Sequence, residues 1–539
     1  MPDAIVIGSG PNGLAGANLL VDAGWDVLVL EAAEHPGGAV RTAELIEPGF
    51  RNDLFSAFYP LGAASPVLRA LDLESHGLRW RRSELAVAHP ARDGSCACLS
   101  MDLDETAASL DAFAPGDGDA WRRLYSLWEK VGRHILHVLF NPFPPVRPAL
   151  GMARALPPPD LVRFLRFLML PVRRLADEEF RGAGGGRLLA GNALHADLTP
   201  EAAGSALYGW LLCSLGQQVG FPVPEGGAGE LSGALARRFE ARGGRLECGA
   251  RVAGVTVRGG SATAVRTADG REIAAARAIL ADTGAPSLYR DLLAPEHVPG
   301  RLRDDLERFQ YDASTVKVDW TLSGPIPWTA PDARRSGTVH VTEGMDALSA
   351  HANQLVTRRI PSEPFLVVGQ YAAFDSTRQP PGAETAWAYS HVPQEVRGDA
   401  GPDGLTGAWD ERETEIFVSR MENEIEALAP GFRELIRGRH TFTPRTMEES
   451  DDNLRGGALN SGTAQLHQQV LFRPTPGLGR PETPVDGLYL ASASAHPGGG
   501  VHGAAGAIAA RAALGEASMT RRPGIRAARA AHRALAGWK

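Results

Sequence analysis

The hydrophobic pattern at the start of the chain changes from one apolar run to a helical stripe and back. Residues 4–7 are apolar and rich in β-branched side chains, which is typical of a buried parallel strand. Apolar residues then recur at helical spacing over 14–20, and Gly24 fits the C-cap of that helix. A second apolar run follows at 25–30. The pattern therefore predicts strand, helix and strand, the start of an α/β fold.

Later segments of the chain differ in their pattern. Alternating residues predict antiparallel strands over 78–102, whereas 104–220 follow helical spacing, with an amphipathic helix over 117–139. Residues 245–281 return to short strands with a hairpin. Between about 290 and 455 the pattern predicts a second, mixed or antiparallel sheet.

A glycine-rich loop joins the first strand to the first helix. Gly8 permits the tight turn, Gly10 lets the backbone approach a pyrophosphate, and Gly13 allows close packing of helix and sheet. The helix N-terminus then favours an anion. Glu31, where the second strand ends, can accept hydrogen bonds from ribose hydroxyls and would repel a 2′-phosphate, which favours FAD or NAD over NADP. The residues predicted to contact the dinucleotide are Gly8, Gly10, Pro11, Asn12, Gly13, Glu31 and Ala32.

A second glycine motif follows at Gly37-Gly38-Ala39-Val40-Arg41-Thr42. Its backbone can pass close to a phosphate, and Arg41 can neutralise that charge. The stretch resembles the segment that follows the dinucleotide fingerprint in FAD enzymes of the amine oxidase and phytoene desaturase superfamily, although Ala39 stands where that family usually has arginine. The resemblance implies FAD as the cofactor. By this resemblance it is held in part by Gly38, Ala39, Arg41 and Thr42.

Three further stretches carry the same resemblance. Residues 49–60 correspond to a segment that passes the flavin, which implies that Asp53, Ser56 and Phe58 lie near it, or else pack in the core. Residues 222–257 resemble the unit that leads the chain back to the cofactor sheet, where the Val252 backbone would meet the adenine ring.

Residues 486–510 resemble the C-terminal flavin segment of the phytoene desaturase and carotenoid isomerase branch. A strand there opens onto three glycines and a helix, whose dipole would stabilise negative charge on a reduced flavin. The resemblance implies contacts with the ribityl chain and the pyrimidine ring. The residues concerned are Ser492, Gly500, Val501 and His502.

The resemblance also implies the domain organisation. We expect an α/β fold in which a Rossmann-like FAD-binding domain, a parallel sheet with a small β-meander, is interleaved with a mixed α+β substrate domain. The predicted ranges are 1–75, 222–290 and 456–515 for the FAD-binding domain, 76–221 and 291–455 for the substrate domain, and 516–539 for a basic tail rich in Ala and Arg.

The predicted function is an FAD-dependent oxidoreductase. A largely apolar substrate, carotenoid- or terpenoid-like, would lose a hydride to flavin N5 and a proton to solvent or a side chain. His496 and His502 are candidate catalytic residues that could act as acid or base or tune the flavin; the alternative is that they shape their loop. The other functions left open are polyene isomerisation on reduced FAD, amine oxidation, and a non-catalytic role like that of Rab dissociation inhibitors.

The composition of the chain limits which partners and ligands are expected. A net charge of −8 with dispersed basic residues gives no reason to expect nucleic acid, and four cysteines without zinc or redox spacing predict no metal site. The other glycine-rich run, 182–187, follows polar residues rather than a strand. Electrons are therefore expected to leave the flavin to oxygen or a quinone. The Arg, Ala and Gly bias suggests a bacterial genome rich in GC.

A run of apolar and basic residues over 161–174 has two interpretations. Arginines face one side, so the helix either lies on a membrane surface or covers a core. No apolar run approaches the about 18 residues that span a bilayer. We expect a cytoplasmic protein, with peripheral contact at the inner face of the membrane under the first interpretation. The predicted apolar side consists of Leu161, Phe164, Leu165, Leu168 and Met169.

Overall fold

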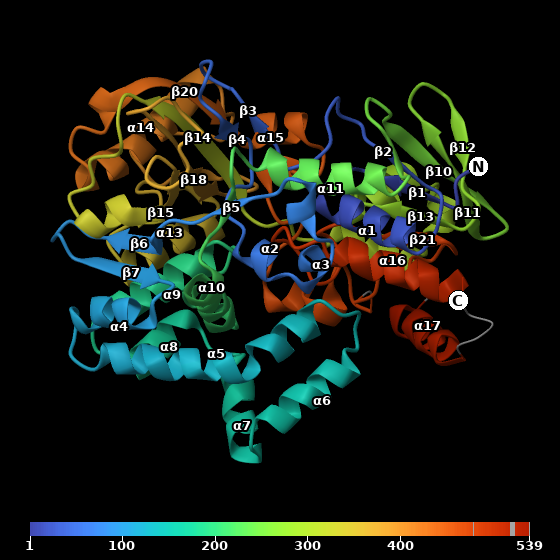
Figure 1. Ribbon diagram of the computed structural model, residues 1–539, viewed down its shortest axis with the longest axis horizontal. Coiled ribbons are helices and arrows are strands. Elements are labelled where there is room, and N and C mark those ends of the chain that lie inside the picture. Colours follow the sequence, from blue (N-terminus) through green and yellow to red (C-terminus); the bar gives the residue numbers. More distant parts are fainter. Residues whose placement is uncertain (478, 518–522, 538–539) are drawn as a thin grey trace.

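The computed structural model describes residues 1–477, 479–517 and 523–537. Residues 518–522 and 538–539 of the predicted basic tail lie outside the described residues. Two sheets stand at opposite ends of the molecule, and a layer of helices lies beneath one of them (Figure 1). The arrangement confirms the expected α/β fold, with a parallel sheet and a separate mixed sheet.

The first sheet is parallel and has five strands in the order β21-β13-β1-β2-β9. Three of its strands come from segments more than 200 residues away from the N-terminal unit, which makes this part of the chain discontinuous. Four of its strands are wholly buried, as their apolar runs require, whereas β9 at the edge is partly exposed. The strands are β1 (Ala4–Ile7), β2 (Val27–Leu30), β9 (Arg245–Glu247), β13 (Ala278–Ala281) and β21 (Leu488–Leu490).

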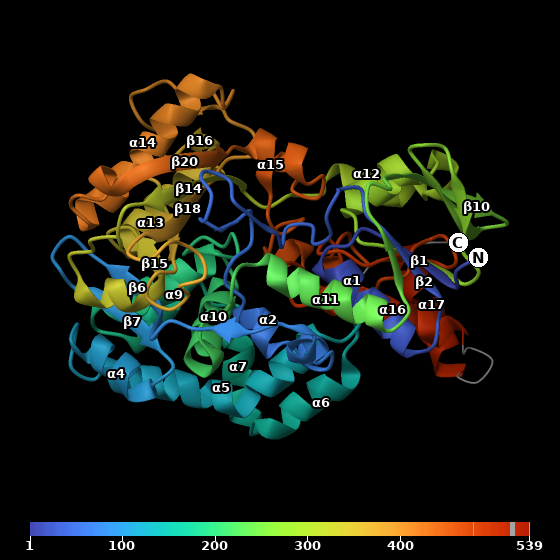
Figure 2. The same cartoon turned by 45° about the horizontal axis from the view of Figure 1, so that its top comes forward.

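Three helices cover one face of this sheet, and a meander covers the other (Figure 2). The helices are α1 (Pro11–Asp22), α11 (Gly229–Ala241) and α16 (Ala504–Ala517). The meander consists of β10 (Val252–Arg258), β11 (Ser261–Thr267) and β12 (Glu272–Ala274), and α12 (Gly300–Glu307) packs nearby. A Cβ at Gly506 would lie 1.7 Å from the carbonyl oxygen of Asn12, so this glycine permits the close crossing of α16 and α1.

The second sheet has seven strands in the order β20-β14-β18-β17-β15-β6-β7. Its neighbours are antiparallel except β15 and β6, which run parallel. Helix α14 (Glu411–Leu428) packs on one face, while helices from the 104–220 segment pack on the other. The strands are β6 (Leu85–Pro90), β7 (Cys96–Ser100), β14 (Ser314–Leu322), β15 (Ser336–Val341), β17 (Leu366–Gln370), β18 (Glu384–Val392) and β20 (Ile436–Phe442).

The 104–220 segment is helical, as predicted, and α5 (Asp117–Leu139) has the predicted bounds. Helices α6 and α7 project from the rest of the molecule at the bottom of Figure 1. The other helices of this layer are α4 (Leu103–Asp111), α6 (Val146–Ala155), α7 (Pro158–Phe167), α8 (Val172–Glu179), α9 (Ala183–Leu194) and α10 (Ser205–Val219).

The predicted single apolar side over 161–174 is wrong. The segment forms two helices: α7 ends at Phe167, and α8 begins after its N-cap, Pro171. Phe164 is buried, whereas Leu165 and Met169 are 55% and 58% exposed. The apolar residues therefore divide between a buried side and a solvent-facing side. Across the described residues, no helix combines the length and apolar character needed to cross a bilayer.

The remaining strands and helices lie outside the two large sheets. Strands β3 and β4 pair with each other, as do β5 and β8. These remaining elements are β3 (Thr42–Ala43), β4 (Asn52–Asp53), β5 (Trp80–Arg81), β8 (Val223–Pro224), β16 (Arg359–Ile360), β19 (Gly398–Asp399), α2 (Pro60–Ala64), α3 (Pro66–Arg69), α13 (Met345–Val356), α15 (Pro444–Ser450) and α17 (Pro523–Ala536).

Candidate active site

A cavity of about 640 Å³, here called the glycine-loop cavity, lies at the carboxyl ends of β1, β2 and β13. Ligands of open α/β sheets bind at this edge. Most of the residues predicted to contact the cofactor meet here, although they come from four distant segments. They are Gly8, Gly10, Pro11, Asn12, Glu31, Ala32, Gly38, Ala39, Arg41, Val252, Ser492, Gly500 and Val501.

The glycines of the loop leading into α1 stand where other residue types would not fit. Gly8 has a φ of +91°, in the region that favours glycine, and a Cβ at Gly10 would lie 2.8 Å from a carboxylate oxygen of Asp282. A Cβ at Gly13 would lie 2.3 Å from the Gly8 carbonyl oxygen. Gly13 therefore serves the packing of helix on sheet, behind the cavity, as its position in the motif predicted.

Glu31 is held at the cavity wall by the backbone around it. One carboxylate oxygen accepts hydrogen bonds from the backbone N–H and the hydroxyl of Ser9, at 2.8 and 2.6 Å. The other accepts from the Ala33 N–H at 2.9 Å. The side chain is 8% exposed, so its orientation is fixed before any ligand arrives. Its contact with a ribose stays a prediction.

Two carboxyl groups at the cavity were missed in the sequence. Asp282 follows β13, and one of its oxygens accepts from the Gly13 N–H at 2.8 Å; burial raises the pKa of this carboxyl to about 7. Asp451 follows α15, and burial raises its pKa to about 6. The position of Asp282 after a predicted strand was a usable signal. Asp451 comes from a stretch assigned to the substrate domain, and no sequence pattern indicated that it would reach the cofactor cavity.

The segment after α15 closes one side of the glycine-loop cavity. Arg41 donates from Nε to the Gly38 carbonyl at 2.7 Å and from Nη2 to the Ser450 carbonyl at 3.1 Å. Asn453 donates to the Asp282 carbonyl at 3.0 Å and accepts from the Gly284 N–H at 2.8 Å. Arg41 therefore lines the cavity while its guanidinium also donates hydrogen bonds to two backbone carbonyls.

Two buried polar atoms of the glycine-loop cavity are available to bind a ligand. Asn12 Oδ1 and Thr283 Oγ1 are buried without a hydrogen bond to any part of the chain that the structure describes. Buried polar atoms are nearly always paired in proteins, so a polar ligand fits here. The helix N-terminus, the glycine turns and these two atoms together suit a dinucleotide. Within the same described ranges there is no group of three or more His, Cys, Asp or Glu side chains that could hold a metal ion.

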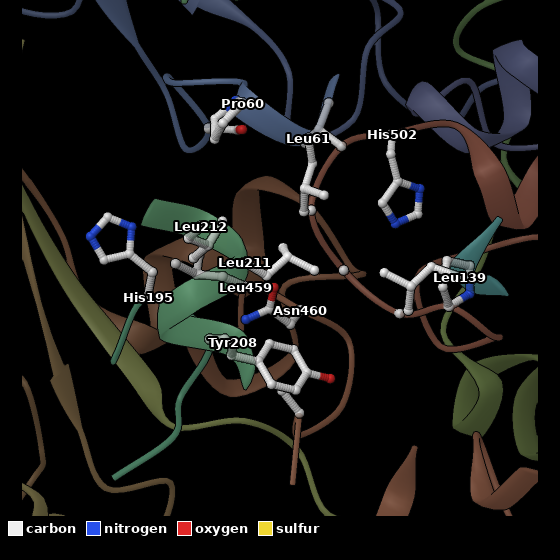
Figure 3. A pocket seen from close by; sticks show the side chains of 18 of the residues that line it. Pro60, Leu61, Leu139, His195, Tyr208, Leu211, Leu212, Leu459, Asn460 and His502 are labelled. Atoms are coloured by element: carbon white, nitrogen blue, oxygen red, sulfur yellow. The ribbon is translucent and has the colours of Figure 1, made fainter. Parts of the chain in front are cut away.

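A second cavity, of about 390 Å³, lies beyond the loop of residues 498–501; it is here called the apolar cavity (Figure 3). Its wall is built largely from aromatic and aliphatic side chains, including Phe58, Leu211 and Trp387. The two cavities share six residues of their walls, so they meet at the C-terminal glycine loop. The shared residues are Ala39, Leu454, Leu459, Gly499, Gly500 and Val501.

Both candidate catalytic histidines line the apolar cavity. His496 Nε2 lies 3.2 Å from the Asn141 carbonyl oxygen, and His502 Nδ1 accepts from the Ala504 N–H at 3.0 Å. Burial lowers the pKa of each imidazole to about 4. Both rings are therefore neutral at pH 7, and both also shape their loop. Their catalytic roles stay a prediction.

The other expected flavin neighbours are distributed differently. Ser56 and Phe58 line the apolar cavity. Thr42 lies outside both cavities and accepts from the Gly229 N–H at 2.9 Å. Asp53 is fully buried in an ion pair and lines neither cavity, which favours the alternative that it packs in the core.

The glycine run at 182–187 opens helix α9 and serves helix packing. A Cβ at Gly184 would lie 2.5 Å from the Phe113 ring, and one at Gly185 would lie 2.6 Å from the Phe180 ring. These glycines therefore bring the start of the helix close to aromatic side chains. No cofactor role is needed to explain them.

Known proteins resemble the chain over almost its whole length. A family model described as flavin containing amine oxidoreductase matches residues 12–514. The rat protein "pyridine nucleotide-disulfide oxidoreductase domain-containing protein 2" is 27% identical, over 94% of this chain and 92% of its own. A neurosporene-forming phytoene desaturase from Cereibacter sphaeroides is 25% identical, over 95% of this chain and 94% of its own. A lycopene-forming one from Pseudescherichia vulneris is 26% identical, over 95% and 99%.

Solved structures share the fold. An oxidoreductase from Methanosarcina mazei has a TM-score of 0.61 at 15% identity, covering 95% of this chain and 99% of its own. Putrescine oxidase bound to putrescine has a TM-score of 0.59 at 16% identity, covering 96% and 99%. Cyclohexylamine oxidase from Brevibacterium oxydans has a TM-score of 0.56 at 16% identity, covering 97% and 100%. At these identities the likeness concerns the fold alone.

Proposed function

The chain belongs to the family of flavin-containing amine oxidoreductases and is an FAD-dependent oxidoreductase, and we propose that it desaturates a largely apolar, carotenoid- or terpenoid-like substrate. The single observation that carries this proposal is the junction of the two cavities. A dinucleotide cavity and a cavity with a mainly apolar wall meet at residues 499–501. Two phytoene desaturases that match 95% of the chain support the same substrate class.

FAD, when bound, supplies the acceptor for a hydride that leaves a carbon atom of the substrate. The protein contributes position and environment. Glu31 and the glycine loop fix one end of the cofactor cavity, and the aromatic wall at Phe58 and Trp387 holds an apolar molecule and excludes water. The neutral His502 ring accepts from the Ala504 N–H at Nδ1 and so carries its proton on Nε2, which leaves it no lone pair for a substrate proton. The proposal therefore assigns that proton to solvent.

Amine oxidation is the second candidate, because amine oxidases share the fold. The apolar cavity argues against it. Arg473 lines the cavity, and although burial lowers its pKa to about 10, its guanidinium stays charged at pH 7. Among the described residues that line this cavity there is no Asp or Glu to pair with an ammonium group. A cationic amine would meet a positive charge and no counter-charge, so a neutral substrate is favoured.

Anaerobic reduction of the bound flavin tests the proposal. Purified holoprotein is mixed without oxygen with a panel of apolar polyenes, terpenoids and amines, and the flavin absorbance is followed. A desaturase bleaches with polyenes or terpenoids and yields a product two hydrogens poorer. Bleaching by amines alone would establish an amine oxidase. Product isomers formed only on pre-reduced flavin would establish an isomerase.

The electron acceptor is part of the same proposal. We propose oxygen or a quinone, because the chain supplies one dinucleotide fingerprint and the glycines of 182–187 pack against phenylalanine rings. The reduced protein is mixed with air-saturated buffer, a short-chain quinone or NAD(P)⁺, and the return of flavin absorbance is timed. Reoxidation by NAD(P)⁺ faster than by the other two would contradict this assignment.

A further inference from the structure

The wall of the apolar cavity contains a histidine, His195, that can donate a hydrogen bond. Hydride transfer to a flavin does not require such a donor. His195 follows α9 and lines the cavity opposite His502 (Figure 3). Its Nε2 lies 2.7 Å from Nε2 of His340, which is on β15 and fully buried. The two rings meet edge to face, 4.9 Å apart.

Both imidazoles of this pair are neutral at pH 7. Burial lowers the pKa of His195 to about 3 and holds that of His340 well below its usual value. A single proton must therefore lie between the two Nε2 atoms, and one ring must donate it to the other. The direction of that bond decides which nitrogen of His195 carries a proton.

The surroundings of His340 settle the direction. Its Nδ1 is buried and has no hydrogen-bond partner in the ranges of the chain that the structure describes. A proton on that atom would be a buried donor without an acceptor, which costs more than an unpaired lone pair. His340 therefore carries its proton on Nε2 and donates it to His195. His195 in turn carries its proton on Nδ1.

His195 Nδ1–H has no acceptor within the described part of the protein. Unlike His340, its ring is only partly buried, and the space on its open side is the apolar cavity. We propose that His195 donates a hydrogen bond to an acceptor atom on the substrate, which is therefore an oxygenated apolar molecule rather than a plain hydrocarbon. The inference rests on the proposed function and narrows its substrate class to molecules that carry a hydroxyl, ether or carbonyl oxygen.

A hydrocarbon and an oxygenated ligand differ in what they do to this group. A hydrocarbon that fills the cavity removes water from the His195 N–H and offers no hydrogen-bond acceptor in its place. A ligand with an oxygen at that position replaces the lost hydrogen bond. Sites that pair a polar group of their substrate discriminate strongly against analogues that lack it.

The experiment compares matched pairs of compounds on the holoprotein. Each pair is a polyene or terpenoid hydrocarbon and its hydroxylated or keto analogue, and the half-saturating concentration for anaerobic flavin bleaching is measured. We expect the oxygenated member to saturate at a concentration roughly tenfold lower or more. His195→Phe should remove most of that preference by raising the value for the oxygenated member. His195→Gln, which keeps an amide N–H donor, should restore part of it.

Two controls separate this result from damage to the fold. His467→Phe replaces an exposed histidine and should keep the preference, and flavin content and thermal unfolding are compared for all variants. Equal half-saturation for both members in the unmodified protein overturns the inference, as does a His195→Phe variant with the preference intact.

Ligand binding without turnover distinguishes this inference from the proposed function. Trp387 lines the same cavity, so quenching of tryptophan fluorescence reports binding even when no compound reduces the flavin. Preferential quenching by the oxygenated member that is lost in His195→Phe supports the inference even if desaturation fails. Equal quenching by both members overturns it, whatever the reaction proves to be.

Discussion

Arg378 donates a hydrogen bond from Nη1 to a carboxylate oxygen of Asp53 at 2.8 Å, and neither side chain is accessible to solvent. The other oxygen of Asp53 accepts from the Ala228 N–H at 2.7 Å and from the Thr42 hydroxyl at 2.9 Å. Arg378 also pairs with Asp375 at 2.9 Å. One ion pair therefore ties the strand after the cofactor motif to the loop before α11 and to the segment after β17.

Asp53→Asn should destabilise the protein strongly without touching either cavity. The change leaves the buried Arg378 with Asp375 as its remaining ionic partner and weakens the hydrogen bonds from Ala228 and Thr42. Breaking a buried ion pair of this kind costs about 3–5 kcal/mol. The matched control is Asp119→Asn, which breaks a surface pair of Arg122 and should cost no more than about 1 kcal/mol. Urea unfolding of both variants measures the difference. A similar loss in the two would show that the Asp53 cluster is not a structural tie.

Glu31→Gln should yield protein largely free of flavin. The amide cannot accept as strongly from ribose hydroxyls, and it also weakens the hydrogen bonds from Ser9 and Ala33 that hold this wall of the cavity. Charge-assisted hydrogen bonds contribute roughly 1.5–3 kcal/mol each, so flavin affinity should fall at least tenfold. Flavin released on denaturation, per mole of protein, is the measurement.

The control for Glu31 is Glu34→Gln, a change at an exposed carboxylate three residues further on. Its flavin content should equal that of the unmodified protein. If Glu31→Gln also keeps full flavin occupancy, the cofactor does not contact this carboxylate, and the ribose assignment is wrong.

Sequence patterns predicted those features of the fold that depend on residues close together in the chain. Strand β1, the glycine loop and the bounds of α5 follow from hydrophobic spacing and turn residues within about 25 positions. For 161–174 the sequence contained half of the correction: Pro171 indicated that Arg173 and Arg174 belong to a second helix. The exposure of Leu165 and Met169 depends on packing that the sequence does not show.

Long-range packing decided the rest of the site. Asp282 reaches the Gly13 N–H across 269 residues of sequence, and Asp451 arrives from the segment after α15. The protonation of His195 depends on His340, which lies 145 residues away. Nothing in the spacing of these residues indicates that they meet, so only the folded chain shows these contacts.

The Asp282 carboxyl should make the stability of the flavin-free chain depend on pH. Its folded pKa is raised to about 7 from a usual 3.8, so between these values the folded chain holds a proton that the unfolded chain has lost. This contribution is fully present below about pH 4 and is lost as the pH rises through about 7. The pKa difference corresponds to about 4 kcal/mol over that interval.

Asp282→Asn should remove this dependence. We expect the urea midpoint of the unmodified flavin-free chain to fall more steeply between pH 5 and pH 8 than that of Asp282→Asn. Asp452→Asn replaces an exposed carboxylate at the same cavity and is the matched control. An unchanged slope in Asp282→Asn would mean that this carboxyl does not hold its proton in the folded state.

Peripheral membrane contact should involve the solvent-facing side of α7 and of the turn that follows it. Phe164 and Phe167 are buried, so charged substitutions there would disturb the core. Val162, Leu165 and Met169 are 68%, 55% and 58% exposed.

We expect the triple substitution of Val162, Leu165 and Met169 by Asp to lower co-sedimentation with anionic vesicles. At roughly 1 kcal/mol for each half-exposed apolar side chain, partitioning should fall on the order of a hundredfold. The control is Val356→Asp, a 70% exposed valine at the end of α13. Apolar substrates dissolve in bilayers, so docking through α7 would bring the apolar cavity close to substrate that is dissolved in the membrane. Equal pelleting of the triple variant and the unmodified protein would remove α7 as a docking surface.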